Sequence, residues 1–337
     1  MIASLRNLLT LHKRPRPPVG ATPHTVVWHE NKWRLLRFVA RAQGLTHQTP
    51  ILLVPSLINR HYVLDLTPGK SFAEFLVQQG FDVFCIDWGT PADEDRYVTF
   101  DDIVDRALGR ALTKTCAAAG RPQVHVLGYC LGGTLSAIHA ALHPEKVASL
   151  TCVAAPVAFV HAGVMRRWLT DSGFDIDALV NGFGLLPAAL LQASFGLLRP
   201  TLPLAKAVNV VDRAWNDKFL DGYLALETWA NDNVAIPGAF YRTYVRDLYQ
   251  KDLLGQRALV VAGRAVDLGQ IRCPVLCVTF GIDAIAPAAC CAPLLDWVGS
   301  DHKQLIEFEG SHVGGMTSSP AAKGLWPRLA QFWRGIP

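Results

Sequence analysis

Cys130 lies in the segment of the chain whose residue types most clearly predict chemistry. Residues 128–132 read G-x-C-x-G, after an apolar run at 123–128 and before a run of helical character at 131–143. A residue on a tight turn between a strand and a helix needs small neighbours, so that the two backbones can approach each other. The N-terminus of the helix then directs its free amides and its dipole at the turn, which favours the thiolate form of a cysteine. The pattern therefore predicts that Cys130 is a catalytic nucleophile.

A nucleophile in this position needs a histidine and an acid, which follow it along the chain in the order acid, histidine. Asp283 comes just after the strand in VTFGIDAIAP, and His312 comes after the last strand in EFEGSHVGG. The carboxylate can accept the imidazole N–H, fix its tautomer and stabilise the imidazolium. We therefore predict a Cys130–His312–Asp283 triad. The other histidines after the nucleophile are placed less well, on the following helix, at the start of an insertion or before the last strand: His139, His143, His161 and His302.

Cys130 and Asp283 also allow purely structural interpretations. Cys130 could be a buried cysteine beside a glycine-rich turn, and Asp283 could only shape a turn. No G-x-S-x-G occurs in the chain, so no serine competes with the cysteine. Backbone amides should form an oxyanion hole, one from Leu131 and one from the loop after the strand 51–55, near Leu57 or Ile58, of which we prefer Ile58.

Alternating strands and helices must position these residues. Two runs, 25–31 and 33–40, predict a hairpin, and the later apolar runs are typical of strands buried on both faces of a parallel sheet. The alternation predicts a mostly parallel, doubly wound sheet, and with the G-x-C-x-G elbow and the order of the triad it predicts an α/β-hydrolase fold. The predicted strands are 51–55, 81–88, 123–128, 147–156, 273–280 and 304–310, and the predicted helices are 71–80, 99–120, 131–143, 288–298 and 321–334.

The alternation stops between 157 and 252, where aromatic residues and leucines recur with helical spacing. We interpret this segment as a helical cap inserted over the carboxyl edge of the sheet. The chain then divides into an N-terminal arm at 1–21, a first core part at 22–156, the cap at 157–252 and a second core part at 253–337. The basic run at 13–16 predicts that the arm is short and solvated.

The composition excludes several classes of protein. Half of the 337 residues are hydrophobic and 18% are charged, so a large folded core is expected. The net charge of +4 is spread along the chain, which argues against a nucleic-acid partner. The eight cysteines show no C-x-x-C pair or zinc spacing, and no apolar stretch reaches transmembrane length. With no signal peptide apparent, this cysteine usage predicts the cytoplasm, and we expect no cofactor and no metal.

Three segments carry a resemblance to a known family: the elbow GYCLGGTL, VPSLINRHYVLDL at 54–66 and GFDVFCIDWGTPADEDRYVTFDD at 80–102. Together they resemble polyhydroxyalkanoate synthases, above all the short class III type, and the similarity covers most of 22–315. The resemblance implies that the Cys130 thiolate attacks the thioester of an (R)-3-hydroxyacyl-CoA and that CoA leaves. A hydroxyl activated by His312 would then attack a neighbouring acyl thioester and extend a polyester.

The resemblance also implies partners and a location. These are the (R)-3-hydroxyacyl-CoA substrate and the growing polyester, a homodimer, a separate synthase subunit and the surface of a polyester granule. Family members commonly carry a histidine directly after the triad aspartate, where this chain has Ala284. The segment 157–252 also matches more loosely than the core. Two other functions stay open: a thioesterase or other hydrolase that uses the triad with water, and a non-catalytic granule-associated homologue.

Overall fold

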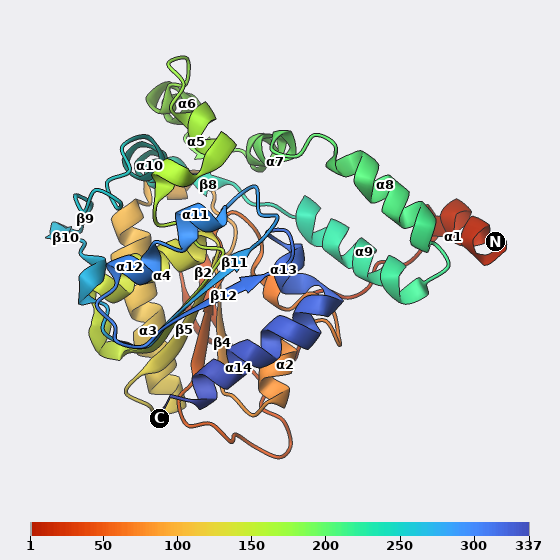
Figure 1. Ribbon diagram of the computed structural model, residues 1–337, viewed down its shortest axis with the longest axis horizontal. Helices are drawn as coiled ribbons and strands as arrows, with labels where there is room; N and C mark the ends of the chain where they lie inside the picture. The colour runs from red at the N-terminus through yellow and green to blue at the C-terminus, as the bar shows by residue number, and fades with distance from the viewer. Residues whose placement is uncertain (1, 337) are drawn as a thin grey trace.

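A single large sheet forms the centre of the computed structural model, which describes residues 2–336 (Figure 1). Its strand order is β1-β2-β4-β3-β5-β6-β11-β12. The hairpin strand β2 is antiparallel to β1 and β4, and the other neighbours are parallel. The prediction of a mostly parallel sheet is confirmed. The strands are β1 (His24–Glu30), β2 (Trp33–Phe38), β3 (Ile51–Val54), β4 (Val83–Asp87), β5 (Val124–Tyr129), β6 (Val147–Val153), β11 (Val275–Phe280) and β12 (Lys303–Phe308).

The sheet separates two hydrophobic cores. Successive side chains of a strand point to opposite faces, and in β3 Leu52 lies in one core while Leu53 lies in the other. Both residues are fully buried, which explains why the central strands are continuous apolar runs. One face is covered by α3 (Leu108–Ala119) and α4 (Leu131–Leu142), and the other by α2 (Phe72–Gln78) and α14 (Trp326–Arg334).

Local signals in the sequence set the ends of the core helices. Ser71 caps α2, since its side chain accepts a hydrogen bond from the Glu74 N–H at 2.9 Å. At the start of the next helical segment, Asp102 N donates to Thr99 Oγ1 at 3.1 Å and Thr99 N donates to the Asp102 carboxylate at 2.9 Å. The first turns of that segment are π-helical, and α3 ends at Gly120 with a left-handed φ of +65°.

The segment between β6 and β11 is mostly helical, as the loss of alternation predicted. Figure 1 shows α7, α8 and α9 (green to cyan) reaching away from the sheet towards α1 (Ile2–Thr10, red). The helices are α5 (Gly163–Leu169), α6 (Ile176–Phe183), α7 (Ala188–Leu197), α8 (Leu202–Arg213), α9 (Asp217–Asn231), α10 (Gly238–Thr243) and the π-helical η7 (Tyr244–Gln250). Two pairs of short strands accompany them, β7 (Leu185–Leu186) with β8 (Ile236–Pro237), and β9 (Val260–Val261) with β10 (Arg264–Ala265). The division into an arm, a two-part core and a cap stays an interpretation of the sequence.

The N-terminal arm contacts the inserted helices through two basic side chains, while most of the run 13–16 is exposed as predicted. Arg14 donates to Asp217 at 2.7 Å and to Asp221 at 2.8 Å, and both acceptors lie on α9. Arg16 donates to Thr228 Oγ1 at 3.0 Å on the same helix. The sequence does not predict these contacts, because the partners lie more than 200 positions away, where a local charge pattern gives no sign of them.

Residues 2–336 contain neither of two features that would suggest a membrane or a metal. No helix in that range is both long enough and apolar enough to cross a membrane. No cluster of three or more His, Cys, Asp or Glu side chains in the same range is arranged to hold a metal ion.

Candidate active site

Cys130 occupies the turn between β5 and α4 in a strained conformation. Its φ of +57° and ψ of −130° lie where a residue with a side chain rarely sits. The surroundings enforce it, because Cys130 N donates to Val153 O at 2.9 Å and Gly133 N donates to Cys130 O at 2.9 Å. Strain of this kind typically costs about 1–3 kcal/mol and persists where the surrounding structure fixes it. The turn presents the thiol, which is partly exposed, at the carboxyl end of β5.

The glycines of the G-x-C-x-G pattern are required by close backbone approach. A Cβ on Gly132 would lie 2.1 Å from Val54 O, and a Cβ on Gly128 would lie 2.3 Å from the Gly133 Cα. Both distances are far shorter than a van der Waals contact, so α4 can pack against β5 and the end of β3 only without these side chains. This packing agrees with the prediction that a tight strand–helix turn needs small residues beside the nucleophile.

Asp283 and His312 lie together beyond the ends of β11 and β12. His312 Nδ1 is 2.6 Å from Asp283 Oδ2, and the aspartate side chain has no exposed surface. The other carboxylate oxygen accepts hydrogen bonds from Ile285 N and Ala286 N, each at 2.8 Å. Asp283 therefore both shapes its turn and orients the imidazole, so the two interpretations of this residue are compatible.

Tyr129 supports the histidine from the residue before the nucleophile. Its hydroxyl donates to the His312 backbone oxygen at 2.9 Å, and the two rings stack with centroids 5.5 Å apart. Burial would lower the pKa of His312, but the charge of the neighbouring Cys130 thiolate and the hydrogen bond to Asp283 raise it to about 10. His312 therefore holds its proton more tightly than a free imidazole does.

Burial raises the pKa of several other thiols in the chain. Burial raises the pKa of Cys273 to about 11 and that of Cys277 to about 12, and it raises the pKa of Cys152 well above its ordinary value. Thiols of this kind react slowly because the thiolate is the nucleophilic form. The sequence interpretation of these residues as small buried hydrophobes agrees with their positions.

The two predicted oxyanion donors have different surroundings. Leu131 is the first residue of α4, where a backbone N–H has no carbonyl one turn earlier in the helix. Ile58 N donates to Ser56 Oγ at 3.2 Å, so this amide already has a partner. The oxyanion roles of Leu131 and Ile58 stay predictions, as do the catalytic roles of the triad.

An apolar cavity of about 240 Å³ opens beside Cys130 beneath the inserted helices. Within it Tyr244 Oη donates to Tyr249 Oη at 3.4 Å, and both tyrosines are buried. The aromatic residues of this segment are apparent in the sequence, but helical spacing alone does not show which of them face the nucleophile. The lining includes Met165, Trp168, Leu191, Phe195, Tyr244 and Tyr249.

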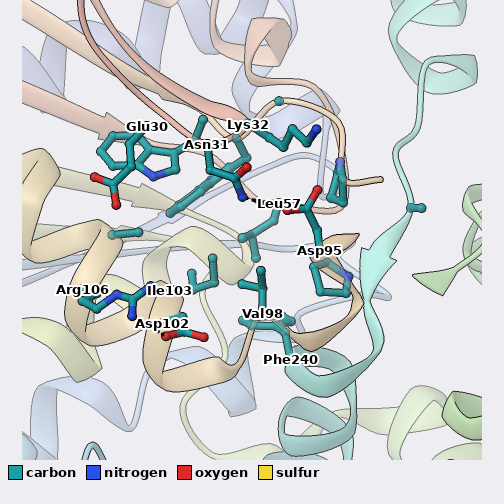
Figure 2. A pocket seen from close by; sticks show the side chains of 17 residues that line it. Glu30, Asn31, Lys32, Leu57, Asp95, Val98, Asp102, Ile103, Arg106 and Phe240 are labelled. Atoms are coloured by element: carbon teal, nitrogen blue, oxygen red, sulfur yellow. Dashed lines mark hydrogen bonds and ion pairs between the residues drawn. The ribbon is translucent and has the colours of Figure 1, made fainter. Parts of the chain in front are cut away.

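Another cavity, of about 110 Å³, lies between the β1–β2 turn and the segment before α3. Figure 2 shows Leu57 near its middle, with the charged side chains of Lys32, Asp95 and Arg106 around its edges. None of the three triad residues lines it, so this second cavity is not part of the candidate active site.

Comparison with known proteins identifies the family. Residues 49–308 match the family model described as the alpha/beta hydrolase fold, and residues 17–76 match the N-terminus of poly-beta-hydroxybutyrate polymerase (PhaC). The poly(3-hydroxyalkanoate) polymerase subunit PhaC of Allochromatium vinosum is 32% identical over 93% of this chain and 88% of its own length. The chain belongs to the PhaC family. Both the fold class and the family resemblance predicted from the sequence are confirmed.

A longer PhaC relative and a solved structure complete the comparison. The PhaC subunit of Haloferax mediterranei is 35% identical over 94% of this chain, which spans 64% of that relative's length. The monoglyceride lipase of Saccharomyces cerevisiae is 13% identical, with a TM-score of 0.57 over 96% of this chain and 99% of the lipase chain. At that identity the lipase shows the shared fold and nothing about the substrate.

Proposed function

We propose that this chain is the catalytic chain of a poly(3-hydroxyalkanoate) polymerase and transfers acyl groups from (R)-3-hydroxyacyl-CoA to a growing polyester. One observation carries the proposal: in a PhaC-family chain, a cysteine on a strained strand–helix turn shares its site with a buried His312–Asp283 pair and an apolar cavity. Membership of the family gives the reaction class, and the site supplies the groups that the reaction needs.

Acylation uses a thiolate–imidazolium pair formed by Cys130 and His312. The Cys130 thiolate attacks the carbonyl carbon of the thioester, and the Leu131 amide at the start of α4 stabilises the oxyanion. The C–S bond to CoA breaks, and the CoA thiolate takes the proton from His312. The acyl group is now a thioester of Cys130, so it keeps nearly all of its reactivity.

Chain growth uses His312 as a base. A hydroxyl group of a 3-hydroxyacyl unit loses its proton to the imidazole and attacks the acyl thioester on the cysteine. The new ester forms, the Cys130–acyl bond breaks, and the thiolate–imidazolium pair is restored. Asp283 holds Nδ1 by its 2.6 Å contact, which leaves Nε2 to accept the proton.

The lining of the cavity supports acyl transfer over hydrolysis. Aliphatic and aromatic side chains surround the acyl site, and the buried Tyr244 and Tyr249 are among them. An apolar lining offers few hydrogen-bond partners to water, whereas it suits the alkyl part of a polyester. The hydrolase alternative differs only in which oxygen attacks the thioester.

The partners and the location inferred from the resemblance are part of this proposal. We propose that the chain forms a homodimer and works with a separate synthase subunit of the class III kind. We also propose that it lies at the surface of polyester granules in the cytoplasm. Ala284 stands where family members commonly have a histidine, so it is a candidate determinant of chain growth.

Incubation with (R)-3-hydroxybutyryl-CoA tests the function. CoA release and the acyl product would be measured in one reaction, with and without the candidate second subunit. We expect CoA release together with insoluble polyester. CoA release with only free hydroxy acid would identify a hydrolase, and no release in either reaction would favour a non-catalytic homologue.

A further inference from the structure

Two cavities meet at Cys130. One is the apolar cavity of about 240 Å³ under the inserted helices, and the other is a small cavity of about 20 Å³ that shares only Cys130 with it. The small cavity is also lined by His312, whereas the large one is not. A volume of this size holds about one water molecule or one hydroxyl oxygen.

Polar and apolar side chains share the wall of the small cavity. Ser56, Asn59 and Arg60 come from the loop after β3, and Tyr129 and His312 come from the catalytic side. Trp229 and Val63 complete the lining. A space of about one oxygen atom, beside the base of the triad, suits a hydroxyl oxygen better than an alkyl chain.

Trp229 closes this cavity from the inserted helices. It lies in the last turn of α9, only 7% of it is exposed, and its Nε1–H donates to Arg60 O at 3.0 Å. Beyond it, Asp232 accepts from Arg60 Nε at 3.0 Å and from Tyr62 Oη at 2.7 Å. These three bonds hold the end of α9 on the loop that follows β3.

The next residues continue the same attachment. Asn233 and Asn59 form an antiparallel bridge, and the Asn59 side-chain amide donates to the Asn233 side-chain oxygen. Val234 N approaches Ile58 O at 3.5 Å. Residues 229–234 therefore pack along the loop that lines the small cavity, and Trp229 reaches the cavity itself.

We propose that the small cavity is the acceptor subsite, which admits the hydroxyl oxygen that attacks the acyl group on Cys130, and that Trp229 keeps bulk water out of it. The inference rests on the proposed polymerase function and identifies what separates polymerisation from hydrolysis at this site. In polymerisation the acceptor R–OH gives its proton to His312 and becomes the ester oxygen. In hydrolysis a water molecule replaces R–OH, and the products are the free hydroxy acid and the restored cysteine.

Changes at Val63 test the subsite without removing a polar group. Its side chain is 4% exposed and lines the small cavity but not the large one. Val63→Ala enlarges the cavity, so the share of acyl units released as free hydroxy acid should rise by roughly tenfold, equivalent to about 1.4 kcal/mol of discrimination against water. Val63→Ile fills the cavity, so the first burst of CoA release should persist while polymer and acid both form more slowly.

Trp229→Ala should have the same effect as Val63→Ala, and Trp229→Phe a smaller one, because the ring still covers the opening. Trp215→Ala is the matched control, since this tryptophan of the same segment is 64% exposed and does not line either cavity. Each variant is checked for wild-type circular dichroism before assay.

An unchanged acid-to-polymer ratio in folded Val63→Ala and Trp229→Phe, with an unslowed second step in Val63→Ile, would overturn the inference. If either tryptophan variant fails to fold, the two valine variants decide the outcome. Failure of the polymerase proposal is recognised separately, because the wild-type protein itself would then make no polymer.

Discussion

His312 Nδ1 lies 2.6 Å from Asp283 Oδ2, at a position where the aspartate side chain is completely buried and 29 residues separate the two along the chain. The same carboxylate also accepts two backbone N–H groups, so its orientation is fixed by three hydrogen bonds. A buried carboxylate held in this way sets the histidine tautomer and leaves the other ring nitrogen to Cys130.

The protonation state of His312 should depend on Cys130. The pKa of His312 is raised from 6.5 to about 10, and burial acts against this shift while the thiolate charge and Asp283 produce it. A raised pKa means that the imidazolium persists through neutral pH and loses its proton only as the pH approaches 10. Removing the thiolate in Cys130→Ala should move this deprotonation to lower pH. Nitrogen-15 NMR of the imidazole across pH 5–11 measures it, and identical curves for the two proteins would contradict the assignment.

Asp283→Asn should impair chain growth more strongly than acylation. The amide can keep the turn bonds to Ile285 and Ala286 through its oxygen while its NH₂ faces His312, which then takes the wrong tautomer for a base. Loss of general-base catalysis costs roughly 10²-fold or more. Rapid-quench measurement of the CoA burst and of later polymer formation separates the two steps. Equal losses in both steps would weaken the second role of Asp283, and normal rates in both would remove it from the mechanism.

Gly133→Ala should destabilise the turn that carries the nucleophile. A Cβ at this position would lie 2.5 Å from the Ala155 Cβ and 2.8 Å from Gly128 O, so α4 must move away from the sheet. We expect a loss of about 2 kcal/mol in the free energy of unfolding, typical of overpacking. Gly182→Ala is the control, because no atom lies within 4 Å of its Cβ position in α6, and it should stabilise by about 0.5 kcal/mol. Urea titration compares them, and equal stabilities would contradict the packing argument.

Leu191→Trp should narrow the range of acyl groups that the enzyme accepts. Leu191 is 5% exposed and lines the large cavity from α7, so a larger ring would occupy space meant for the acyl chain. The ratio kcat/KM for 3-hydroxyhexanoyl-CoA should fall about tenfold more than that for 3-hydroxybutyryl-CoA, the scale expected for a few methylene groups. Leu197→Trp is the control on the same helix, where the side chain is 64% exposed. Parallel losses for both substrates would show that the cavity does not hold the acyl chain.

Much of the core could be predicted from the sequence because its signals are local. The continuous apolar runs of β3 and β4 are buried on both faces, and the glycines around Cys130 are needed where backbones nearly touch. The order of Cys130, Asp283 and His312 along the chain then follows from where parallel strands end. These three residues are brought to one edge of the sheet by the topology, which the alternation of elements already implies.

The inserted helices could not be predicted in the same detail. Their apolar residues have helical spacing, but the spacing does not tell which face packs on Cys130 and which is exposed, as Tyr244 and Trp215 illustrate. The attachment of Arg14 to α9 and of Asp232 to Arg60 depends on charges more than 170 residues apart. Such pairs form only after the chain has folded, so local patterns cannot reveal them.

The acyl-enzyme is the most direct test of the account. The wild-type protein and Cys130→Ala would be mixed briefly with (R)-3-hydroxybutyryl-CoA, quenched in acid and examined by intact-protein and peptide mass spectrometry. We predict one or more 3-hydroxybutyryl groups on the wild-type peptide that contains Cys130, removable by hydroxylamine, and none on the folded alanine variant. Turnover of the thioester by Cys130→Ala, or an acyl group on another residue of the wild-type protein, would contradict the central claim that Cys130 is the nucleophile.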